Sequence, residues 1–182
     1  MIFRRCTPGV FALLLLAGCQ RHEAAPPPIA MPKTNAPSPS IPGWPPTKAQ
    51  PKLQTMKLFV GPETVTAELC LTEVQVGTGM MFRKEMAEND GMLFVFARPH
   101  RTSFYMRNTT LPLTAAYIDS EGTILELHDL EPLNETPVPA SSDNVQYVLE
   151  MNRGWFKRHN LAAGAAISCE AGKLGDAFRF GR

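Results

Sequence analysis

The chain has 182 residues, and its 18 Lys and Arg residues nearly balance its 17 Asp and Glu residues, which gives a formal net charge of +1. A near-neutral chain without basic clusters lacks the electrostatic footprint of a nucleic-acid-binding protein. Nucleic acid is therefore not expected as its main partner.

The N-terminus is typical of an exported protein. Two arginines precede an apolar run at residues 10–17, which is too short for a stable transmembrane helix and predicts a signal peptide over residues 1–18. The run ends in Leu-Ala-Gly-Cys, which closely resembles the bacterial lipobox and implies lipidation of Cys19. The membrane is then an expected partner, because two acyl chains suffice for stable attachment. Gln20 rather than Asp follows, which by resemblance to Gram-negative sorting rules favours the outer membrane, facing the periplasm.

Residues 19–52 are expected to carry the lipid and form a tether. Residues 24–51 hold ten of the 17 prolines and a single aromatic residue, Trp44. A segment of this composition buries too little apolar surface to fold, so it is predicted to be an extended, semi-stiff spacer. Removal of the signal peptide takes away two arginines and no acidic residue, which leaves 16 basic against 17 acidic residues and a net charge of −1.

Residues 53–173 are predicted to be one β-rich domain, and residues 174–182, which show no periodicity, a loose C-terminal tail. Apolar residues alternate with polar ones at 65–71, and "GMLFVF" at 91–96 is a continuous apolar run suited to a buried strand. "AAYID" and "TILEL" flank Ser120-Glu121-Gly122 as a hairpin, while "VQYVLEM" and "AAISCE" predict two later strands.

Two short helices are expected between these strands. Thr72 and Gln75 have the spacing of a capping box, so a helix should begin there and end at the glycines that follow. Asn152 is expected to cap a second helix through "RGWFKRH", which Asn160 should end in the left-handed conformation. Six or more short strands with two short helices predict a mainly β fold. We expect an antiparallel β-sandwich or small barrel, at the margin of the α+β class.

Two cysteines, Cys70 and Cys169, remain in the domain once the signal peptide is removed and Cys19 is lipidated. Disulfides persist in exported proteins, so one interpretation is a possible disulfide that closes a loop of about 100 residues. The other is a pair of free cysteines that serve as small apolar residues in strands.

Six motifs follow one another along residues 57–170: "GMMFRKEM", "GMLFVF", "FYMRNTTLPL", "YIDSEG", "ETPVPASS" and "YVLEMNRGWFKRH". Their order and spacing resemble domain-of-unknown-function family 192, also called uncharacterised protein family 0127. The resemblance implies a compact β-rich domain and no established activity. In that family the central motif reads Phe-Trp-Met-Lys-Asn-Thr, followed by Ile-Pro-Leu-Asp. Here Tyr105 and Arg107 are mild exchanges, but Thr114 removes a carboxylate, and Ala165 stands where a later Asp is common.

Polar residues embedded in apolar motifs are the best candidates for a site. Each stands near the end of an apolar strand or turn, where an unpaired charge is costly to bury: Arg83, Arg107, Asn108, Asp119, Glu150 and Asn152. One interpretation is a structural network, in which either arginine pairs with either acid and Asn108 binds backbone. The other is a ligand cleft, in which arginines and amides hold a carboxylate, phosphate or sugar, and Phe104 or Tyr105 supplies a stacking surface.

The sequence contains no obvious catalytic motif. No pair of the four histidines has metal-ligand spacing, and no serine-elbow, zinc-helix or phosphate-loop motif occurs, so no metal or cofactor is expected. The leading hypothesis is a lipid-anchored, non-enzymatic binding or accessory module of the cell envelope, for a polysaccharide, small anionic ligand or protein partner. One alternative is a carbohydrate-active hydrolase or transferase with Asp119 and Glu150 as its carboxylate pair. Another is a purely structural envelope protein.

Overall fold

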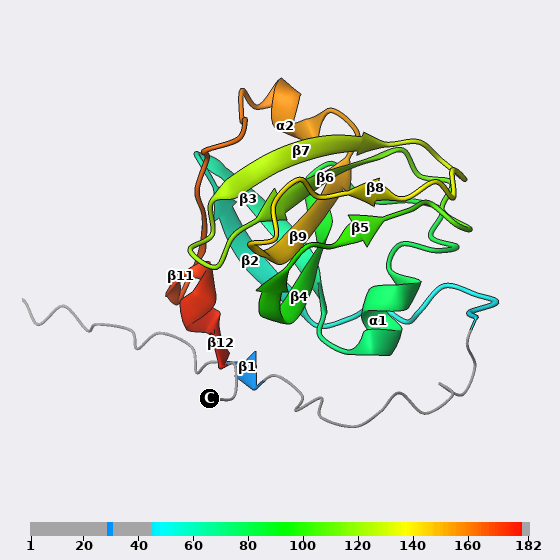
Figure 1. Ribbon diagram of the computed structural model, residues 1–182, viewed down its shortest axis with the longest axis horizontal. Helices are drawn as coiled ribbons and strands as arrows, with labels where there is room; N and C mark the ends of the chain where they lie inside the picture. The colour runs from blue at the N-terminus through cyan, green and yellow to red at the C-terminus, as the bar shows by residue number, and fades with distance from the viewer. Residues whose placement is uncertain (1–28, 31–44, 180–182) are drawn as a thin grey trace, which may run out of the picture.

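The computed structural model describes residues 29–30 and 45–179, and it is mainly β with two short α-helices, as the sequence predicts (Figure 1). The signal peptide, Cys19 and most of the tether lie outside the described residues. Within the described ranges no helix is long and apolar enough to cross a membrane. The elements are β1 (Ile29–Ala30), β2 (Thr55–Val60), β3 (Glu63–Cys70), α1 (Glu73–Thr78), β4 (Asp90–His100), β5 (Ser103–Phe104), β6 (Leu113–Ile118), β7 (Ile124–Leu130), β8 (Val138–Pro139), β9 (Val145–Asn152), α2 (Trp155–Arg158), β10 (Ile167–Cys169), β11 (Gly172–Lys173), the 3-10 helix η1 (Leu174–Ala177) and β12 (Phe178–Arg179).

Eight of these strands form one curved sheet in the order β11-β10-β2-β3-β4-β9-β6-β7. Neighbours are antiparallel except β3 and β4, which run parallel because the connection through α1 returns the chain to the end where β3 began. The sheet is therefore mixed rather than purely antiparallel. Its two ends approach each other at a single bridge between Thr123 and Ala166, so the expected barrel does not close. Two short pairs, β5 with β8 and β1 with β12, stand outside this sheet.

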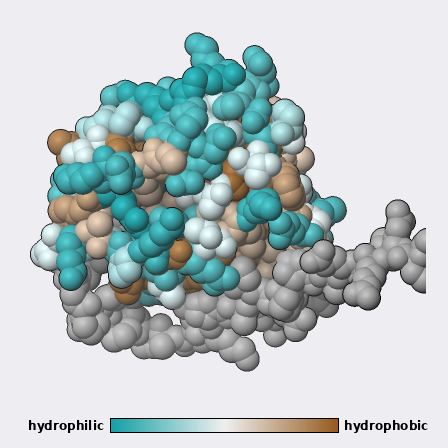
Figure 2. Space-filling model, turned by 180° about the vertical axis from the view of Figure 1, so that it is seen from behind, coloured by the Kyte–Doolittle hydropathy of each residue, from teal (hydrophilic) through white to brown (hydrophobic). Residues whose placement is uncertain are grey.

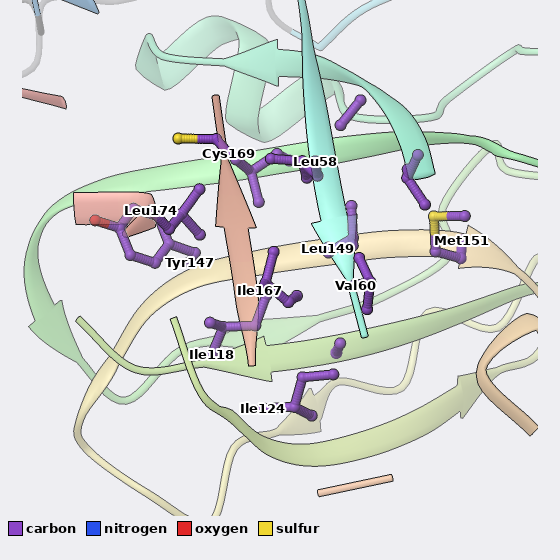
Figure 3. Packing of buried hydrophobic residues seen from close by; sticks show 14 of the residues in the cluster. Leu58, Val60, Ile118, Ile124, Tyr147, Leu149, Met151, Ile167, Cys169 and Leu174 are labelled. Carbon is purple, nitrogen blue, oxygen red and sulfur yellow. The ribbon is translucent and has the colours of Figure 1, made fainter. Parts of the chain in front are cut away.

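The central strands are buried on both faces, which divides the core into two clusters. In β9, Tyr147, Leu149 and Met151 belong to the first cluster, whereas Val148 belongs to the second. Figure 3 shows side chains of the first cluster, among them Leu58 from β2, converging inside the curve of the sheet. The second cluster lies on the outer face, under β5, β8 and α1. Strands covered on both faces have continuous apolar sequences, which explains the pattern of "GMLFVF".

Local sequence signals correctly place most helix boundaries. The capping box of α1 is formed, because the Thr72 hydroxyl accepts from the Gln75 amide at 3.3 Å and the Gln75 side chain accepts from the Thr72 amide at 3.1 Å. Asn160 has the expected left-handed conformation, with φ 55°. The expectation that Asn152 caps the second helix is wrong, since α2 begins after Gly154, whose φ of 74° makes the turn.

The sequence predicts a loose C-terminal tail from residue 174, and this prediction is wrong up to residue 179, where the segment packs into the core. Leu174 is fully buried, and Ala177 and Phe178 are each 4% exposed in the first cluster. Its length is too short for a periodic pattern, so its apolar residues gave no signal. At the other boundary, the Gln50 side chain donates to the Gly79 carbonyl at 2.8 Å, so the domain begins slightly before residue 53.

The possible disulfide is not formed. Cys70 and Cys169 are both free and buried. Cys70 belongs to the second cluster and Cys169 to the first, so the sheet separates them. Both serve as small apolar core residues, which is the alternative interpretation.

Gly122, in the hairpin between β6 and β7, is predicted to be intolerant of a side chain. Its φ is +88°, and a Cβ there would lie 2.4 Å from the Ile167 carbonyl oxygen. Gly164 is the matched control, because its φ is +91° but nothing lies within 4 Å of its Cβ position. Both G122A and G164A should lower the free energy of unfolding by ~1–2 kcal/mol, because alanine is unfavourable at a positive φ. G122A should lose a further ~1–3 kcal/mol by overpacking, as measured by urea unfolding. Equal losses would contradict the close approach of β10 to this turn.

Candidate functional site

A small pocket opens on the outer face of the sheet, over the C-terminal half of β9. Its volume is about 150 Å³, and its lining comes from the end of α1 and the turn that follows, from residues 102–106, and from β4 and β9. Figure 1 shows α1 and β5 on this side of the molecule. The pocket therefore lies between the sheet and the short elements that cover its second cluster.

The walls of the pocket are apolar and aromatic. Phe104 of β5 packs edge-on against Phe94 of β4, with ring centroids 4.8 Å apart and an interplanar angle of 83°. Met80 and Met81 follow α1, and Met106 follows β5, and all three are buried. Methionine side chains are unbranched and polarizable, so they can adapt to a ligand of irregular shape.

Glu150 of β9 is the acidic residue of the pocket lining. Only 4% of this residue is exposed, and its carboxyl has no hydrogen bond or ion pair with any residue in the described part of the chain. Burial raises the pKa of the Glu150 carboxyl from 4.5 to about 8. A buried carboxyl without a partner is costly, and it is a common feature of functional sites.

The register of the sheet determines where Glu150 points. Glu150 is opposite Met92 of β4 and Ala115 of β6, and both of these residues belong to the second cluster. Because side chains alternate between the two faces of a strand, the carboxyl must enter that cluster. Its charge acts on two other ionisable groups, Cys70 of β3 and Tyr117 of β6. Burial raises the pKa of both groups, so they stay protonated at neutral pH.

Of the predicted site residues, Phe104, Tyr105 and Glu150 line this pocket. Arg107 does not. Its guanidinium lies 5.7 Å from the centre of the Tyr105 ring and forms an exposed ion pair of 2.7 Å with Glu135. Asn108 is in the left-handed conformation, with φ 53°, and its carbonyl accepts from the Phe82 amide at 2.8 Å.

Arg83 pairs with a residue that the sequence analysis did not consider. Its guanidinium donates to the Glu68 carboxylate at 2.8 Å and to the Pro51 carbonyl at 3.3 Å, and Glu68 also accepts from the Leu53 amide at 2.7 Å. The expected pairing of Arg83 or Arg107 with Asp119 or Glu150 is therefore wrong. Arg83 lines a separate cleft of about 480 Å³ with lysine and acidic residues along it, and its hydrogen bonds fix the start of the domain.

Asp119 and Glu150 are not a catalytic pair. The Asp119 carboxylate accepts from the amides of Glu121 at 2.9 Å and Thr123 at 2.8 Å, which fixes the hairpin after β6. Glu150 is opposite Ala115, four residues earlier along β6, which corresponds to ~13 Å at 3.3 Å per residue. With its carboxylate bound to the hairpin amides at this distance along the strand, Asp119 is not placed to act with Glu150 across one glycosidic bond.

Asn152, the last of the predicted site residues, lies outside the pocket. The Asn152 amide donates to the carbonyls of Met86 at 3.3 Å and Ala87 at 2.9 Å, so it supports a loop rather than the pocket. The missed lining residues include two buried threonines and the three methionines: Thr78, Met80, Met81, Met106 and Thr109. The motifs "GMMF" and "FYM" contained the signal, because methionines recur in both. Across the described ranges no group of three His, Cys, Asp or Glu residues is arranged to hold a metal ion.

Glu150 makes a testable contribution to the pH dependence of stability. Because burial raises the pKa of Glu150 in the folded protein, the protonated carboxyl favours the folded state over the unfolded one. This contribution is complete below about pH 4.5 and is lost as the pH rises through about 8. The free energy of unfolding should therefore fall across this interval by up to ~1.4 kcal/mol per pH unit. E150Q, which cannot ionise, should remove this slope in urea unfolding measured at several pH values. E135Q removes an exposed carboxylate and is the control that should keep it.

Comparison with known proteins places the chain in a family. The DUF192 family, described as "Uncharacterized ACR", matches residues 56–169, more than half of the chain. A candidate transcription regulator from Sinorhizobium meliloti is 31% identical, with a TM-score of 0.62, and the alignment covers 66% of this chain and 97% of that one. A protein of unknown function from Novosphingobium aromaticivorans is 30% identical, with a TM-score of 0.61, and the alignment covers 64% and 86%. A search of curated proteins found no match. The chain belongs to the DUF192 family.

Proposed function

We propose that this protein is a lipid-anchored, non-enzymatic binding module of the cell envelope, which takes up a small ligand in the pocket over Glu150. The lipobox-like sequence that ends at Cys19 and the proline-rich tether support the anchored, exported location. The β-rich domain supplies the site at the end of that tether.

The observation that carries the proposal is a buried carboxyl without a partner in the lining of an apolar pocket. Glu150 is 4% exposed, and a volume of about 150 Å³ remains open beside it. A purely structural protein gains nothing from such an arrangement, because an apolar residue in the same place would be less costly to bury. An apolar pocket with a few polar groups is the usual form of a small-molecule site.

The size and lining of the pocket narrow the range of ligands. A volume of about 150 Å³ is too small for a polysaccharide chain, and no Lys, Arg or His lines the pocket to attract an anion.

Figure 2 shows hydrophilic residues over much of the back of the molecule, with hydrophobic ones scattered among them. Among the described residues the large, exposed hydrophobic ones are Val74, Tyr105 and Leu133. This scatter favours a small ligand over a protein partner that needs a broad apolar surface.

The description of the Sinorhizobium meliloti relative does not lead us to propose DNA binding. The net charge of +1, or −1 once the signal peptide is removed, gives no overall attraction to a phosphate backbone. A membrane anchor would also keep the domain away from DNA.

The pocket is tested by the methyl NMR signals of methionine. In the full-length protein, at least one of three four-carbon probes, 1-butanol, butylammonium or butyrate, should shift the signals of Met80, Met81 and Met106. Met151 lies in the first cluster and should not respond. S103W places a large side chain at the exposed rim of the pocket and should abolish the shifts. T110W, an exposed change outside the lining, should leave them intact. If none of the probes shifts the three signals, the proposed site is wrong.

The anchor is tested by replacing the cysteine that should carry the lipid. Wild-type protein should fractionate with membranes and carry acyl chains by mass spectrometry, whereas C19S should lose both properties, because a serine cannot receive the thioether-linked lipid. C6S removes a cysteine that the signal peptide should take away, so it should behave as wild type. A membrane-bound C19S protein without acyl chains would overturn the lipid anchor.

A further inference from the structure

The ionisable groups of the Glu150 pocket favour a cation. Its lining contains Glu150 and no Lys, Arg or His, so a bound anion would meet a carboxyl without any compensating positive charge. A bound cation would supply the partner that the Glu150 carboxyl lacks. Charge-assisted hydrogen bonds of this kind are about twice as strong as neutral ones.

The other polar groups of the pocket are suited to accept hydrogen bonds. The Thr109 hydroxyl donates to the Arg107 carbonyl at 3.2 Å, which leaves its oxygen lone pairs as acceptors. Thr78 is 4% exposed, and its side chain has no hydrogen bond to any residue that the structure describes. Thr78 and Thr109 are the buried hydroxyl residues of the lining, and with the carboxylate they can accept hydrogen bonds from the three donors of a primary ammonium group.

The apolar walls favour an alkyl chain behind that ammonium group. Rings of Phe94, Phe96, Phe104 and Tyr105 line the pocket, and aromatic faces attract cations as well as apolar groups. The volume of about 150 Å³ is well below the ~300 Å³ at which drug-sized pockets begin, so the ligand must be short.

We propose that the pocket over Glu150 binds small primary alkylamines, with the ammonium group on the Glu150 carboxylate and the two threonine hydroxyls, and the alkyl chain against the aromatic and methionine walls. This inference rests on the proposed binding function and specifies its ligand.

The affinity of the pocket for an alkylamine should depend on pH. A free Glu150 carboxyl is largely protonated at neutral pH, so an ammonium ion must displace its proton to form the ion pair. Cys70 of β3 and Tyr117 of β6 interact with the Glu150 charge and remain neutral, while Glu68 of β3, in register with Glu150 across β4, is paired with Arg83 at 2.8 Å. Affinity for an alkylamine, which itself stays protonated below ~10, should therefore rise by about tenfold per pH unit below pH 8 and then level off.

The test compares three probes of equal length on the full-length protein. Butylammonium, 1-butanol and butyrate differ only in the charge and donors of their head group, and their dissociation constants follow from the Met80, Met81 and Met106 methyl signals. At about pH 8 we expect butylammonium to bind at least about tenfold more tightly than 1-butanol, as a charge-assisted hydrogen bond implies. Butyrate should bind most weakly. E150Q should bring the butylammonium and 1-butanol affinities together and abolish the pH dependence.

The outcomes separate the ligand class from the binding function. If 1-butanol or butyrate binds as tightly as butylammonium to the wild type, the pocket is a site but the ammonium assignment is wrong. If no probe binds, the binding function itself fails. The pH profile of the wild-type protein provides a measurement that does not depend on the folding of E150Q, and an affinity that stays constant between about pH 6 and 8 would also overturn the assignment.

Discussion

Strand β9 is buried on both of its faces, and this constraint determines most of what surrounds it. Tyr147, Leu149 and Met151 must point into the first core cluster, and Val148 and Glu150 into the second. Strands β4 and β6 flank Glu150 within the sheet, so its side chain points out of the sheet and into the pocket. A shift of one residue in register would move every apolar side chain of β9 to the wrong face. The carboxyl is therefore held in place by the packing of its neighbours rather than by bonds of its own.

Only short elements, among them α1, β5 and β8, cover the face of the sheet that carries the second cluster, which leaves room for a pocket. Hydrogen bonds from separate loops and short strands hold the covering segments to the sheet and to one another. The Tyr117 hydroxyl donates to the Val138 carbonyl at 2.6 Å and so fixes β8 above β6. The Met106 amide donates to the Asn134 carbonyl at 2.7 Å, and the Ala140 amide to the Thr102 carbonyl at 2.9 Å. Short segments connected in this way cannot fill the space as a second sheet would.

Features that depend on neighbours in sequence could be predicted, and those that depend on distant pairing could not. The capping box at Thr72 and the left-handed turn at Asn160 involve residues within a few positions of each other, and both are confirmed. The partner of Arg83 lies 15 residues away on β3, and no local pattern identifies it. Likewise, the sequence marked Glu150 as unusual in an apolar strand. Its pocket, however, is assembled from the end of α1, β4, β9 and the segment around β5, which only the fold brings together.

Thr114 stands where the family resemblance leads one to expect Asp, and its hydroxyl connects β7 to the start of α2 by hydrogen bonds. The Thr114 hydroxyl donates to the Asp129 carboxylate at 2.5 Å, across the β6–β7 pair, and accepts from the Gly154 amide at 3.0 Å. A carboxylate at position 114 could accept from that amide directly, whereas here the threonine does so and Asp129 supplies the carboxylate one strand away. Thr114 and Ala115 are adjacent on β6, so their side chains point to opposite faces of the sheet. Ala115 belongs to the second cluster, into which its neighbour Glu150 also points, so the Thr114 side chain lies on the other face. The departure from the family motif therefore supports the start of α2 and leaves the Glu150 pocket unchanged.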